Sequence, residues 1–497
     1  MVEFIMFDVN VEKLNDVWLQ ITTSQSIKME LSDHFAFHVD GYKFHPKVKQ
    51  RIWDGKIRLF QAYTGLLPIG LYAHLLKYCN LCEYTINAIP DLNLKDPNFD
   101  KWVDGLPITT NGEIIKPRDY QINSAKRMIF NKSQGLIECP TSSGKSLMQY
   151  LVSRWTLNNL SGKVLITVPT KDLVVQMRGD LLDYSSTDDD FGSDDIHIIM
   201  GGKEKDSGDA RVVISTWQSV CKMPKEWFAQ FDCYMADEAH TATAKNITTI
   251  VQNLVKCPIK AGLSGTFKES QSHLLALVGH FGAVYKPVTT RELIDSGTVS
   301  QLKVRTVLLQ YPEKDIMERK GLPYQTEIAT LTSDVRRNIK CCKLAKSIAD
   351  KGKNVVIMYK HIKHGNELKK ICDKIHDKVY ITNGSTDVDD RNNLRAIAEA
   401  EGGVIIIAST GVFSTGVNIK RLHAIIMTHP MKSKIIILQT IGRILRKHGS
   451  KSQAVFYDIV DDLRWKKWKS YSLKHAVDRI KLYNSQEFDY SITKVKL

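Results

Sequence analysis

One stretch of the chain decides its fold: Pro140-Thr141-Ser142-Ser143-Gly144-Lys145-Ser146. It follows a mostly apolar run at 135–139 and opens into a second one at 147–152, so we predict a strand, a tight loop and a helix. In such a loop the backbone N–H groups and the helix N-terminus face a phosphate, Lys145 reaches the outer phosphates, and the Ser146 hydroxyl binds Mg²⁺. All seven residues are therefore predicted to bind a nucleotide. The strict pattern has glycine where Cys139 stands, and a chance Gly-Lys-Ser turn is the alternative.

The composition is that of an ordinary folded protein with a strongly basic balance. The 497 residues are enough for about three domains, and the hydrophobic share of 43% supports a core in each. No apolar run approaches the roughly 18 residues of a membrane span, and the first residues lack a basic signal region. The nine scattered cysteines suit a reducing compartment, so we expect a cytoplasmic protein. The net charge of +15 favours a polyanionic partner, most often nucleic acid.

Residues 1–108 precede the phosphate loop and are predicted to form a small α/β domain. Alternating apolar and polar residues predict two strands that turn at Asp40-Gly41, and Asp54-Gly55 predicts a second hairpin. Cations with an aromatic residue among them are typical of a surface that holds phosphates and stacks on bases. The predicted nucleic-acid contacts are Lys47, Arg51, Trp53, Lys56 and Arg58. The alternative is a solvated strand face with Trp53 in the core.

Residues 109–288 alternate strands with helices, which predicts a parallel α/β sheet. Gln121 lies in a helix predicted just before the phosphate strand, and its side-chain amide can both donate to and accept from an adenine edge. A strand at 163–168 leads to Pro169-Thr170, and a strand at 212–215 leads to Thr216. In sheets of this kind, loops at the carboxyl ends of the strands build the site.

A second anchor is the stretch Asp237-Glu238-Ala239-His240, which ends an apolar strand. Adjacent carboxylates suit the hydrolysis of a magnesium-bound nucleotide: Asp237 holds the Mg²⁺ shell, while Glu238 orients and deprotonates the attacking water. His240 can couple this site to a neighbouring domain, unless it is a capping or core histidine. The next strand delivers Ser264-Gly265-Thr266, whose Ser264 and Thr266 we assign to the same coupling.

Residues 289–460 are predicted to form a second array of strands and helices, with a third anchor near its end. A polar, glycine-bearing loop is predicted at 409–418, where Thr410 and Gly416 can approach phosphates or nucleic acid. The third anchor is Gln439-Thr440-Ile441-Gly442-Arg443-Ile444-Leu445-Arg446. Its two arginines are spaced i, i+3 on one helical face, so both can neutralise charge on a γ-phosphate as arginine fingers do. Two solvated arginines are the alternative.

These motifs, in this order, resemble those of the superfamily 2 helicases. The resemblance covers motifs Q, I, Ia, II, III, V and VI at Gln121, 140–146, Pro169-Thr170, 237–240, 264–266, 409–418 and 439–446. It implies two RecA-like domains in tandem that close on ATP and open after its hydrolysis. The implied catalytic residues are Lys145, Asp237, Glu238, Gln439, Arg443 and Arg446, and the implied contacts to the nucleic-acid backbone include Thr170, Thr216 and Thr410. The family commonly has aspartate where Asn418 stands, so the role of that residue is open.

Residues 461–497 are predicted to form a C-terminal extension. The run Arg464-Trp465-Lys466-Lys467-Trp468-Lys469 is basic and aromatic, and a helix is predicted after it. Such a segment can hold nucleic acid, or it can pack against the second motor domain.

Longer strings of sequence resemble the UvsW-type recombination and repair helicases of T-even bacteriophages. They lie at 40–42, 53–59, 224–228, 411–416 and 439–450. The resemblance implies remodelling of branched DNA in phage recombination, repair and replication: Holliday-junction branch migration, replication-fork regression and R-loop unwinding. It also implies forks, D-loops and RNA–DNA hybrids as partners, with a monomer or weak oligomer at work in the host cytoplasm.

Two other functions stay open. One is an RNA helicase that acts on structured RNA, and the other is a nucleic-acid-binding switch that hydrolyses ATP without moving along a strand. A restriction-type motor is disfavoured, because Pro90-Asp91 has no Asp/Glu-x-Lys after it at nuclease spacing.

Overall fold

The computed structural model describes residues 7–39, 41–89, 94–131, 135–201, 206–242, 244–267, 271–415 and 419–497. By their internal contacts the residues form two compact units. One unit comprises 1–139 and 144–287, and the other comprises 288–497, with which 140–143 are grouped. Among the helices of the described ranges, none is long and apolar enough to cross a membrane.

The N-terminal domain is built on a four-stranded sheet. Its strands are β1 (Val9–Lys13), β2 (Trp18–Thr23), β5 (Leu66–Pro68) and β6 (Ile86–Asn87), and its longer helices are α1 (Gln25–His34) and α3 (Tyr72–Leu81). β1 pairs antiparallel with β2 and parallel with β6, and β5 pairs antiparallel with β2. Buried residues of the sheet and both helices, among them Val9, Leu31 and Leu75, pack into one core.

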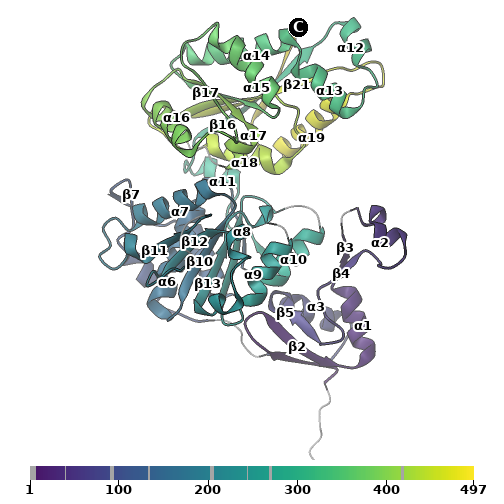
Figure 1. Cartoon of the computed structure of the whole chain (residues 1–497), viewed down its shortest axis with the longest axis vertical. Coiled ribbons are helices and arrows are strands. Elements are labelled where there is room, and N and C mark those ends of the chain that lie inside the picture. The colour runs from purple at the N-terminus through teal and green to yellow at the C-terminus, as the bar shows by residue number, and fades with distance from the viewer. Residues whose placement is uncertain are drawn as a thin grey trace, which may run out of the picture. The chain divides into compact units, whose positions relative to one another are not determined.

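A small lobe, here called the N-terminal lobe, is formed by residues 36–58 between α1 and β5 (Figure 1). It consists of β3 (Ala36–His38), a 3₁₀ turn (Tyr42–Phe44), α2 (Pro46–Lys49) and β4 (Lys56–Arg58). β3 pairs antiparallel with β4, so both predicted hairpins are wrong. Pro46 begins a helix, a position where its fixed φ is favourable, and Arg51 has a φ of +57°, which is incompatible with a strand. Asp40 lies outside the described residues.

The first motor domain contains a seven-stranded parallel sheet. The strands in chain order are β9 (Leu136–Glu138), β10 (Lys163–Val168), β11 (Ile196–Ile199), β12 (Val212–Thr216), β13 (Phe231–Ala236), β14 (Ile259–Ser264) and β15 (Val284–Tyr285). Their order in the sheet is β11-β12-β10-β13-β14-β9-β15. β12 is buried along its whole length, as expected for a parallel strand covered on both faces.

Helices cover both faces of this sheet. They are α4 (Phe99–Asp104), α5 (Asp119–Phe130), α6 (Lys145–Asn159), α7 (Lys171–Tyr184), α8 (Trp217–Val220), α9 (Ala244–Asn253) and α10 (Gln271–Phe281), and a short ladder of β7 (Thr109–Thr110) and β8 (Glu113–Ile114) precedes α5. Successive residues of β10 belong to different cores: Ile166 packs with residues of α5, α6 and α7, whereas Leu165 packs with residues of α9 and α10.

The N-terminal domain shares the second of these cores with the first sheet. The Lys260 ammonium donates to the Asp16 carbonyl at 2.5 Å, and Asp16 N–H donates to the Val255 carbonyl at 3.1 Å. Gly70 approaches α10 so closely that a Cβ there would lie 2.3 Å from the Val278 carbonyl oxygen. The N-terminal domain is therefore packed firmly on the first motor domain.

The second motor domain repeats the seven-stranded parallel sheet. The strands in chain order are β16 (Gln301–Gln310), β17 (Asn354–Tyr359), β18 (Val379–Thr382), β19 (Ile405–Ser409), β20 (Leu422–Met427), β21 (Gln453–Asp462) and β22 (Tyr490–Lys496). Their order in the sheet is β18-β19-β17-β20-β21-β16-β22. In both sheets the strands of the domain therefore occur in the order third, fourth, second, fifth, sixth, first and seventh.

The helices of the second domain connect and cover these strands. They are α11 (Thr290–Asp295), α12 (Glu313–Arg319), α13 (Tyr324–Thr332), α14 (Val335–Ala349), α15 (Ile362–Asp373), α16 (Val388–Ala400), α17 (Thr410–Thr415), α18 (Lys434–Ile444) and α19 (Tyr471–Ser485). Alternation of this kind is what the predicted α/β class requires.

The C-terminal extension is part of the second sheet. Besides the predicted helix α19 it contains β22, which pairs parallel with β16. From α19, Arg479 makes a buried bidentate pair with Asp458 of β21 at 2.8 and 2.9 Å, and its remaining nitrogen donates to the Met431 carbonyl. The extension therefore packs against the second motor domain, one of the two possibilities that the sequence left open.

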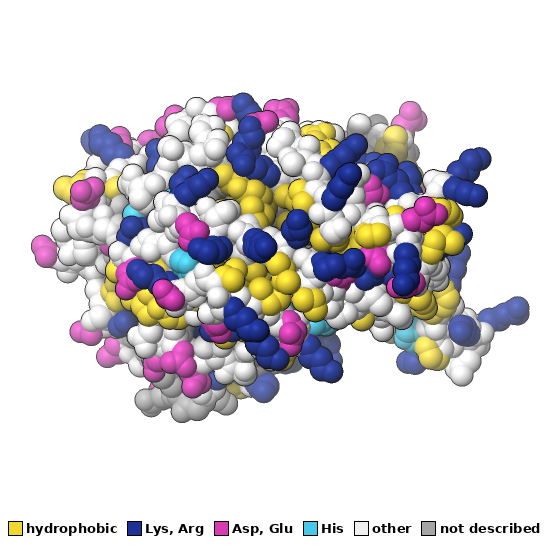
Figure 2. Space-filling view, turned by 90° about the horizontal axis from the view of Figure 1, so that it is seen from above, with side chains coloured by type: hydrophobic (Ala, Val, Ile, Leu, Met, Phe, Trp, Pro, Cys, Tyr) yellow, Lys and Arg dark blue, Asp and Glu magenta, His cyan; other side chains and the backbone are white. Residues whose placement is uncertain are grey.

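Charged side chains are spread over the surface. Figure 2 shows Lys and Arg side chains scattered over the visible face, with acidic and apolar groups between them. On this face the positive side chains do not gather in a single patch, so charge alone does not show where nucleic acid binds.

Candidate active site

The first two anchors meet at one edge of the first sheet. β14 lies between β9, which precedes the phosphate loop, and β13, which precedes the paired carboxylates. Since all three strands are parallel, their carboxyl ends lie at the same edge. Cys139 N–H donates to the Ser264 carbonyl at 2.9 Å, and Asp237 N–H donates to the Thr167 carbonyl at 2.8 Å. Backbone pairing therefore fixes the first residue beyond each of β9 and β13.

The phosphate loop, residues 140–146, adopts the predicted turn between β9 and α6. Ser143 N–H donates to the Pro140 carbonyl at 3.2 Å, and Ser143 is buried while Thr141 and Ser142 are half-buried. Ser142 and Gly144 have φ of +72° and +82°, left-handed values that the tight turn uses and that favour glycine at 144.

Gln121 packs against this loop. Its side-chain oxygen accepts from Arg118 N–H at 2.8 Å, and a Cβ added to Gly144 would lie 2.3 Å from its amide nitrogen. The positive φ therefore favours glycine at 144, and a larger residue there would have to displace the Gln121 amide. The adenine contact predicted for Gln121 stays a prediction. In the structure the side-chain oxygen of Gln121 caps the start of α5.

Lys145 and Glu238 form an ion pair in the site, with 3.1 Å between Nζ and Oε1. Burial opposes the charge on Lys145, but Glu238 and Asp237 outweigh it and raise the pKa of the ammonium. Burial likewise opposes the charge on Glu238, yet Lys145 and His240 lower the pKa of this carboxyl. Glu238 also has a φ of +46°, a strained conformation that is typical of functional sites. Both groups are therefore held in their charged forms.

Asp237 is buried beside this pair and has the opposite tendency. Burial and the neighbouring Glu238 charge raise its pKa. Its Oδ1 lies 3.4 Å from Gln149 Nε2, and the Ser146 hydroxyl lies 2.9 Å from the Tyr184 hydroxyl. Gln149 and Tyr184 lie outside the recognised motifs. Gln149 follows Lys145 by four residues on one helix, and this spacing was a signal that could have placed Gln149 near the site. Tyr184 had no such signal.

The donor set fits a magnesium ion bound to a nucleotide. Ser146 and Asp237 offer a hydroxyl and a carboxylate oxygen, the hard ligands that Mg²⁺ prefers, and both lie at the same sheet edge. Mg²⁺ in nucleotide sites takes its remaining ligands from phosphates and water.

His240 joins the second anchor to the end of β14. It is buried, and its Nδ1 lies 2.7 Å from Ser264 Oγ and 3.3 Å from Glu238 Oε2. The Ser264 hydroxyl donates to the Thr266 carbonyl at 2.7 Å, so it must accept from His240, which fixes the proton on Nδ1. The predicted coupling residues His240, Ser264 and Thr266 thus form one hydrogen-bonded chain, and His240 places this chain beside Glu238.

In the second unit, α18 carries Gln439 and, in its last turn, Arg443. Both side chains are half-buried. The helix ends at Ile444, so Arg446 lies beyond it and the predicted sharing of one helical face is wrong for this residue. The reason is a contact from a distant part of the chain: the carbonyls of Leu445 and Arg446 accept from Ser300 N–H and Oγ at 2.8 and 3.3 Å, which turns the chain out of the helix.

The predicted polar loop at 409–418 is partly helical, because α17 begins directly at Thr410. Thr410 Oγ1 donates to the Tyr359 carbonyl at 2.8 Å. Thr170 Oγ1 accepts from Leu173 N–H as the N-cap of α7, and Thr216 precedes α8. All three threonines therefore begin helices, and their contacts with nucleic acid stay predictions. Gly416 and Asn418 lie outside the described residues.

The N-terminal lobe separates its predicted contacts into two groups. Lys47 and Arg51 are exposed, whereas Arg58 is paired with Asp54 at 2.6 Å, and Asp33 lies 3.9 Å from Lys56 and 3.6 Å from Arg58.

The aromatic residues of the lobe differ in exposure, and the nucleic-acid contact of Trp53 stays a prediction. Trp53 is half-buried and donates through Nε1 to the Lys56 carbonyl at 2.9 Å, so it helps to close the lobe. Phe44 is 80% exposed and Ile52 is 71% exposed. Phe44 lies in the basic segment between β3 and β4, and its place among cations was a usable signal.

Models of known protein families match the chain in three regions. "DNA helicase UvsW, N-terminal" matches residues 8–88, "Type III restriction enzyme, res subunit" matches 114–269, and "Helicase conserved C-terminal domain" matches 337–448. The restriction-enzyme match covers the first motor domain, and Pro90-Asp91 precede it, outside the described residues.

Individual relatives extend this comparison. The ATP-dependent DNA helicase UvsW of Enterobacteria phage T4 is 40% identical over 496 residues, covering 96% of this chain and 98% of the relative. A crystal structure of T4 UvsW matches with 39% identity and a TM-score of 0.54, covering 98% and 99% of the two chains. A structure of a Saccharomyces cerevisiae Dbp5 variant bound to RNA and ADP BeF3 shares only the fold, with 15% identity and a TM-score of 0.55 over 82% of this chain and 95% of that one. The chain belongs to the UvsW family of superfamily 2 DNA helicases.

Proposed function

We propose that this ATP-dependent helicase remodels branched DNA, by migrating Holliday junctions, regressing replication forks and unwinding R-loops. The observation that carries the motor chemistry is the single sheet edge where Lys145, Asp237 and Glu238 converge and from which His240 leads to Ser264. The branched substrate is supported by similarity to T4 UvsW over nearly the whole chain, including the N-terminal domain.

In the proposed mechanism the phosphate loop binds the phosphates of ATP and Lys145 contacts the outer ones. Ser146 and Asp237 would hold Mg²⁺, which would supply positive charge beside the phosphates. Glu238 orients the attacking water and takes its proton, a role supported by its ionised carboxylate and its position beside Lys145. Because a strongly acidic carboxylate is a weak base, release of Glu238 from Lys145 by the ATP phosphates would make it a better one.

We further propose that α18 supplies Gln439 and Arg443 to the same reaction, with Arg446 from the turn that follows. Guanidinium groups neutralise the charge that develops on the γ-phosphate. Closure of the two motor domains on ATP and their opening after hydrolysis would then drive stepping along a strand. Supporting this assignment is the identical strand order of the two sheets, since tandem RecA-like domains share one architecture.

The N-terminal lobe is the proposed contact to DNA outside the motor. Lys47 and Arg51 are exposed cations, and Phe44 offers an aromatic face for stacking on a base. Contacts of this kind hold the backbone and do not read sequence, which suits a protein that recognises branched shapes. We also propose that the protein acts as a monomer or weak oligomer in the host cytoplasm. Its proposed domains are residues 1–108, 109–288, 289–460 and 461–497.

The test compares nucleic acids of different shape. ATP hydrolysis and strand movement are measured in the presence of a four-way DNA junction, a linear DNA duplex or an RNA hairpin. The proposal expects branch migration of the junction that depends on ATP. Stronger stimulation by the RNA hairpin would favour an RNA helicase, and equal hydrolysis on all three without strand movement would favour an ATP-gated binding switch.

A further inference from the structure

Lys451 is a buried lysine just beyond the motif VI segment. Lys451 is 6% exposed. Its ammonium donates to the carbonyls of Lys420, Leu422 and Ile444 at 3.0, 2.9 and 2.8 Å. An ammonium has three N–H donors and no acceptor, so these three hydrogen bonds use all of its capacity.

The three carbonyls lie in or directly beyond two functional segments. Lys420 and Leu422 lie where the chain leaves the motif V segment and enters β20. Ile444 is the last residue of α18 and directly follows Arg443. A single cation therefore ties the exit of motif V to the end of the helix that carries motif VI.

The end of α18 is a place where such a tie has a strong effect. The last carbonyls of a helix lack partners within the helix, and a cation there also interacts favourably with the helix dipole. Ser300 satisfies the carbonyls of Leu445 and Arg446, while Lys451 satisfies that of Ile444. The direction of the last turn, and with it that of Arg443, depends on these contacts.

We propose that Lys451 is a positioning residue for ATP hydrolysis. Its ammonium holds the end of α18 against the exit of motif V, so that Arg443 keeps its orientation and the two segments move together. This inference rests on the role proposed above for Arg443.

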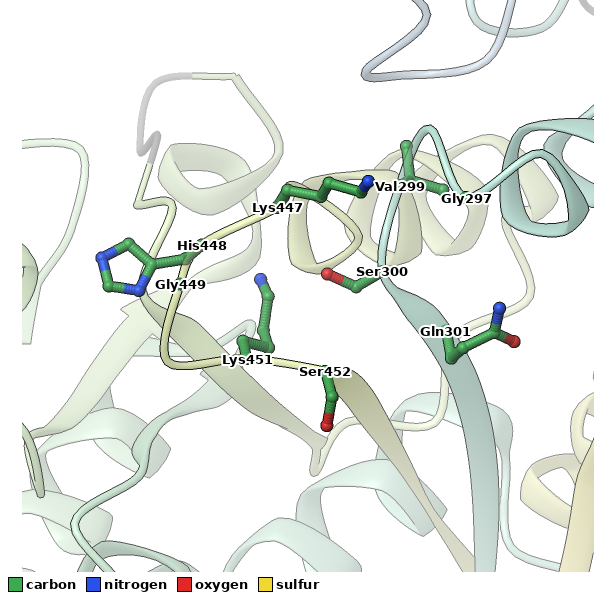
Figure 3. Close-up of a pocket in the computed structure, with 9 residues that line it drawn as sticks. All are labelled: Gly297, Val299, Ser300, Gln301, Lys447, His448, Gly449, Lys451 and Ser452. Carbon is green, nitrogen blue, oxygen red and sulfur yellow. The ribbon is translucent and has the colours of Figure 1, made fainter.

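Lys451 borders a pocket that opens to the surface. Figure 3 shows Lys451 and Ser300 pointing toward a common space, while Gln301 and Ser452 point away from it. The space is a surface pocket of about 570 Å³ that Lys447 also lines. Protons can therefore exchange with Lys451 without unfolding of the domain.

The surroundings of Lys451 lower the pH at which its ammonium loses a proton. Burial lowers its pKa to about 8, Glu399 of α16 opposes this shift, and Arg446 adds to it. His423 of β20 is neutral, because burial lowers its pKa to about 4, and His448 Nδ1 lies 2.8 Å from Ser450 Oγ. A neutral Lys451 has two N–H donors for three carbonyls, so one of the ties is lost above this pKa.

Loss of this tie should reduce activity without unfolding the protein. An unfolded lysine keeps its proton to a pKa of about 10.4, so between roughly pH 8 and pH 10 the unfolded state binds more protons than the folded one. Titration of Lys451 in this window therefore raises the free energy of unfolding as pH increases. If kcat falls in this pH window while the free energy of unfolding rises, the loss of activity comes from local positioning and not from unfolding.

The experiment uses the full chain with Lys451→Arg, Lys451→Met and, as a matched control in the same turn, Lys447→Met. kcat and KM for ATP are measured with a four-way DNA junction from about pH 7 to pH 10, and the melting temperature is measured at each pH. Wild type should lose kcat by up to about tenfold per pH unit above pH 8, with KM nearly constant. Lys451→Arg keeps its charge and should abolish this fall, Lys451→Met should have a low kcat at every pH, and Lys447→Met should behave like wild type.

Several outcomes would overturn the inference. A wild-type profile that is flat across pH 8, or a Lys451→Arg profile identical to that of wild type, contradicts it even if Lys451→Met does not fold. If Lys451→Met hydrolyses ATP normally while Arg443→Ala does not, the inference fails and the proposed function stands. Full hydrolysis by Arg443→Ala would instead overturn the proposed role of the arginine, and the inference with it.

Discussion

Lys145 Nζ lies 3.1 Å from Glu238 Oε1, although 93 positions separate the two residues in the sequence. The residue proposed to bind the outer phosphates is thus the ion-pair partner of the residue proposed to activate water. Phosphates that contact Lys145 would compete with Glu238 for its charge. Nucleotide binding and the availability of the base are therefore linked through one contact.

Glu238→Gln should separate binding from hydrolysis. Loss of a positioned general base should lower kcat by about 10²–10⁴-fold. ATP affinity should be equal to or higher than that of wild type, because the amide no longer competes for Lys145. Single-turnover hydrolysis and titration with a fluorescent ATP analogue measure the two effects, and Glu226→Gln, an exposed glutamate of the same unit, is the control. A parallel loss of binding and hydrolysis would contradict the assigned role.

His240→Ala should impair the use of ATP more than its hydrolysis. The chain of His240, Ser264 and Thr266 beside Glu238 is broken, while Lys145 and Asp237 are untouched. We expect the amount of DNA unwound per ATP hydrolysed to fall.

Ser264→Ala tests whether this chain acts as a unit. Substitutions within one hydrogen-bonded network do not have additive effects. The double variant His240→Ala, Ser264→Ala should therefore lose little more coupling than the more impaired of the two single variants. Branch migration and phosphate release are measured in the same reactions. Additive losses, or normal coupling in His240→Ala, would count against the chain as a coupling element.

Substitutions in the N-terminal lobe should distinguish its exposed cations from its paired ones. Lys47→Ala and Arg51→Asn, which tolerates the positive φ at this position, should each weaken DNA binding and lower the salt dependence of log K by about 1. Arg58→Ala should have a smaller effect, because Asp54 and Asp33 already compensate its charge. Binding is measured on a junction at several salt concentrations. Equal effects of all three changes would show that the ion pairs do not determine which cations bind DNA.

The second motor domain should lose stability in mild acid. Burial lowers the pKa of His364 to about 3, while unfolded histidine has a pKa of about 6.5. A lowered pKa means that the stabilisation is complete above the unfolded pKa and declines as pH falls toward the folded one, by about 2 kcal/mol at pH 5. Urea unfolding at pH 7 and pH 5 should show this decrease, and His364→Gln should reduce it. The same pH dependence in both proteins would mean that His364 does not contribute.

The sequence predicted the parts of the fold that depend on local patterns. A strand, a glycine-bearing turn and a helix are specified within residues 135–152, and the paired carboxylates are specified by the end of an apolar strand. Parallel strands then require that these loops meet at one edge. Gln149 and Tyr184 could not be predicted with their partners, because they are ordinary helical residues whose contacts depend on packing between α6, β13 and α7.

The failures have identifiable structural causes. The alternation over 35–47 resembles a hairpin, but Pro46 begins a helix and β3 finds its partner at β4. β22 was missed because, as an edge strand, it buries little and lacks an apolar pattern. Arg446 was assigned to a helix that ends earlier, since the cap is made by Ser300 from a distant part of the chain.

The central claim is tested most directly by ATP hydrolysis and branch migration of a four-way DNA junction with wild type and Lys145→Ala. We predict that wild type hydrolyses ATP and moves the junction, and that the variant does neither while its melting temperature stays close to that of wild type. Branch migration by folded Lys145→Ala, or hydrolysis by wild type without any movement of the junction, would contradict the account.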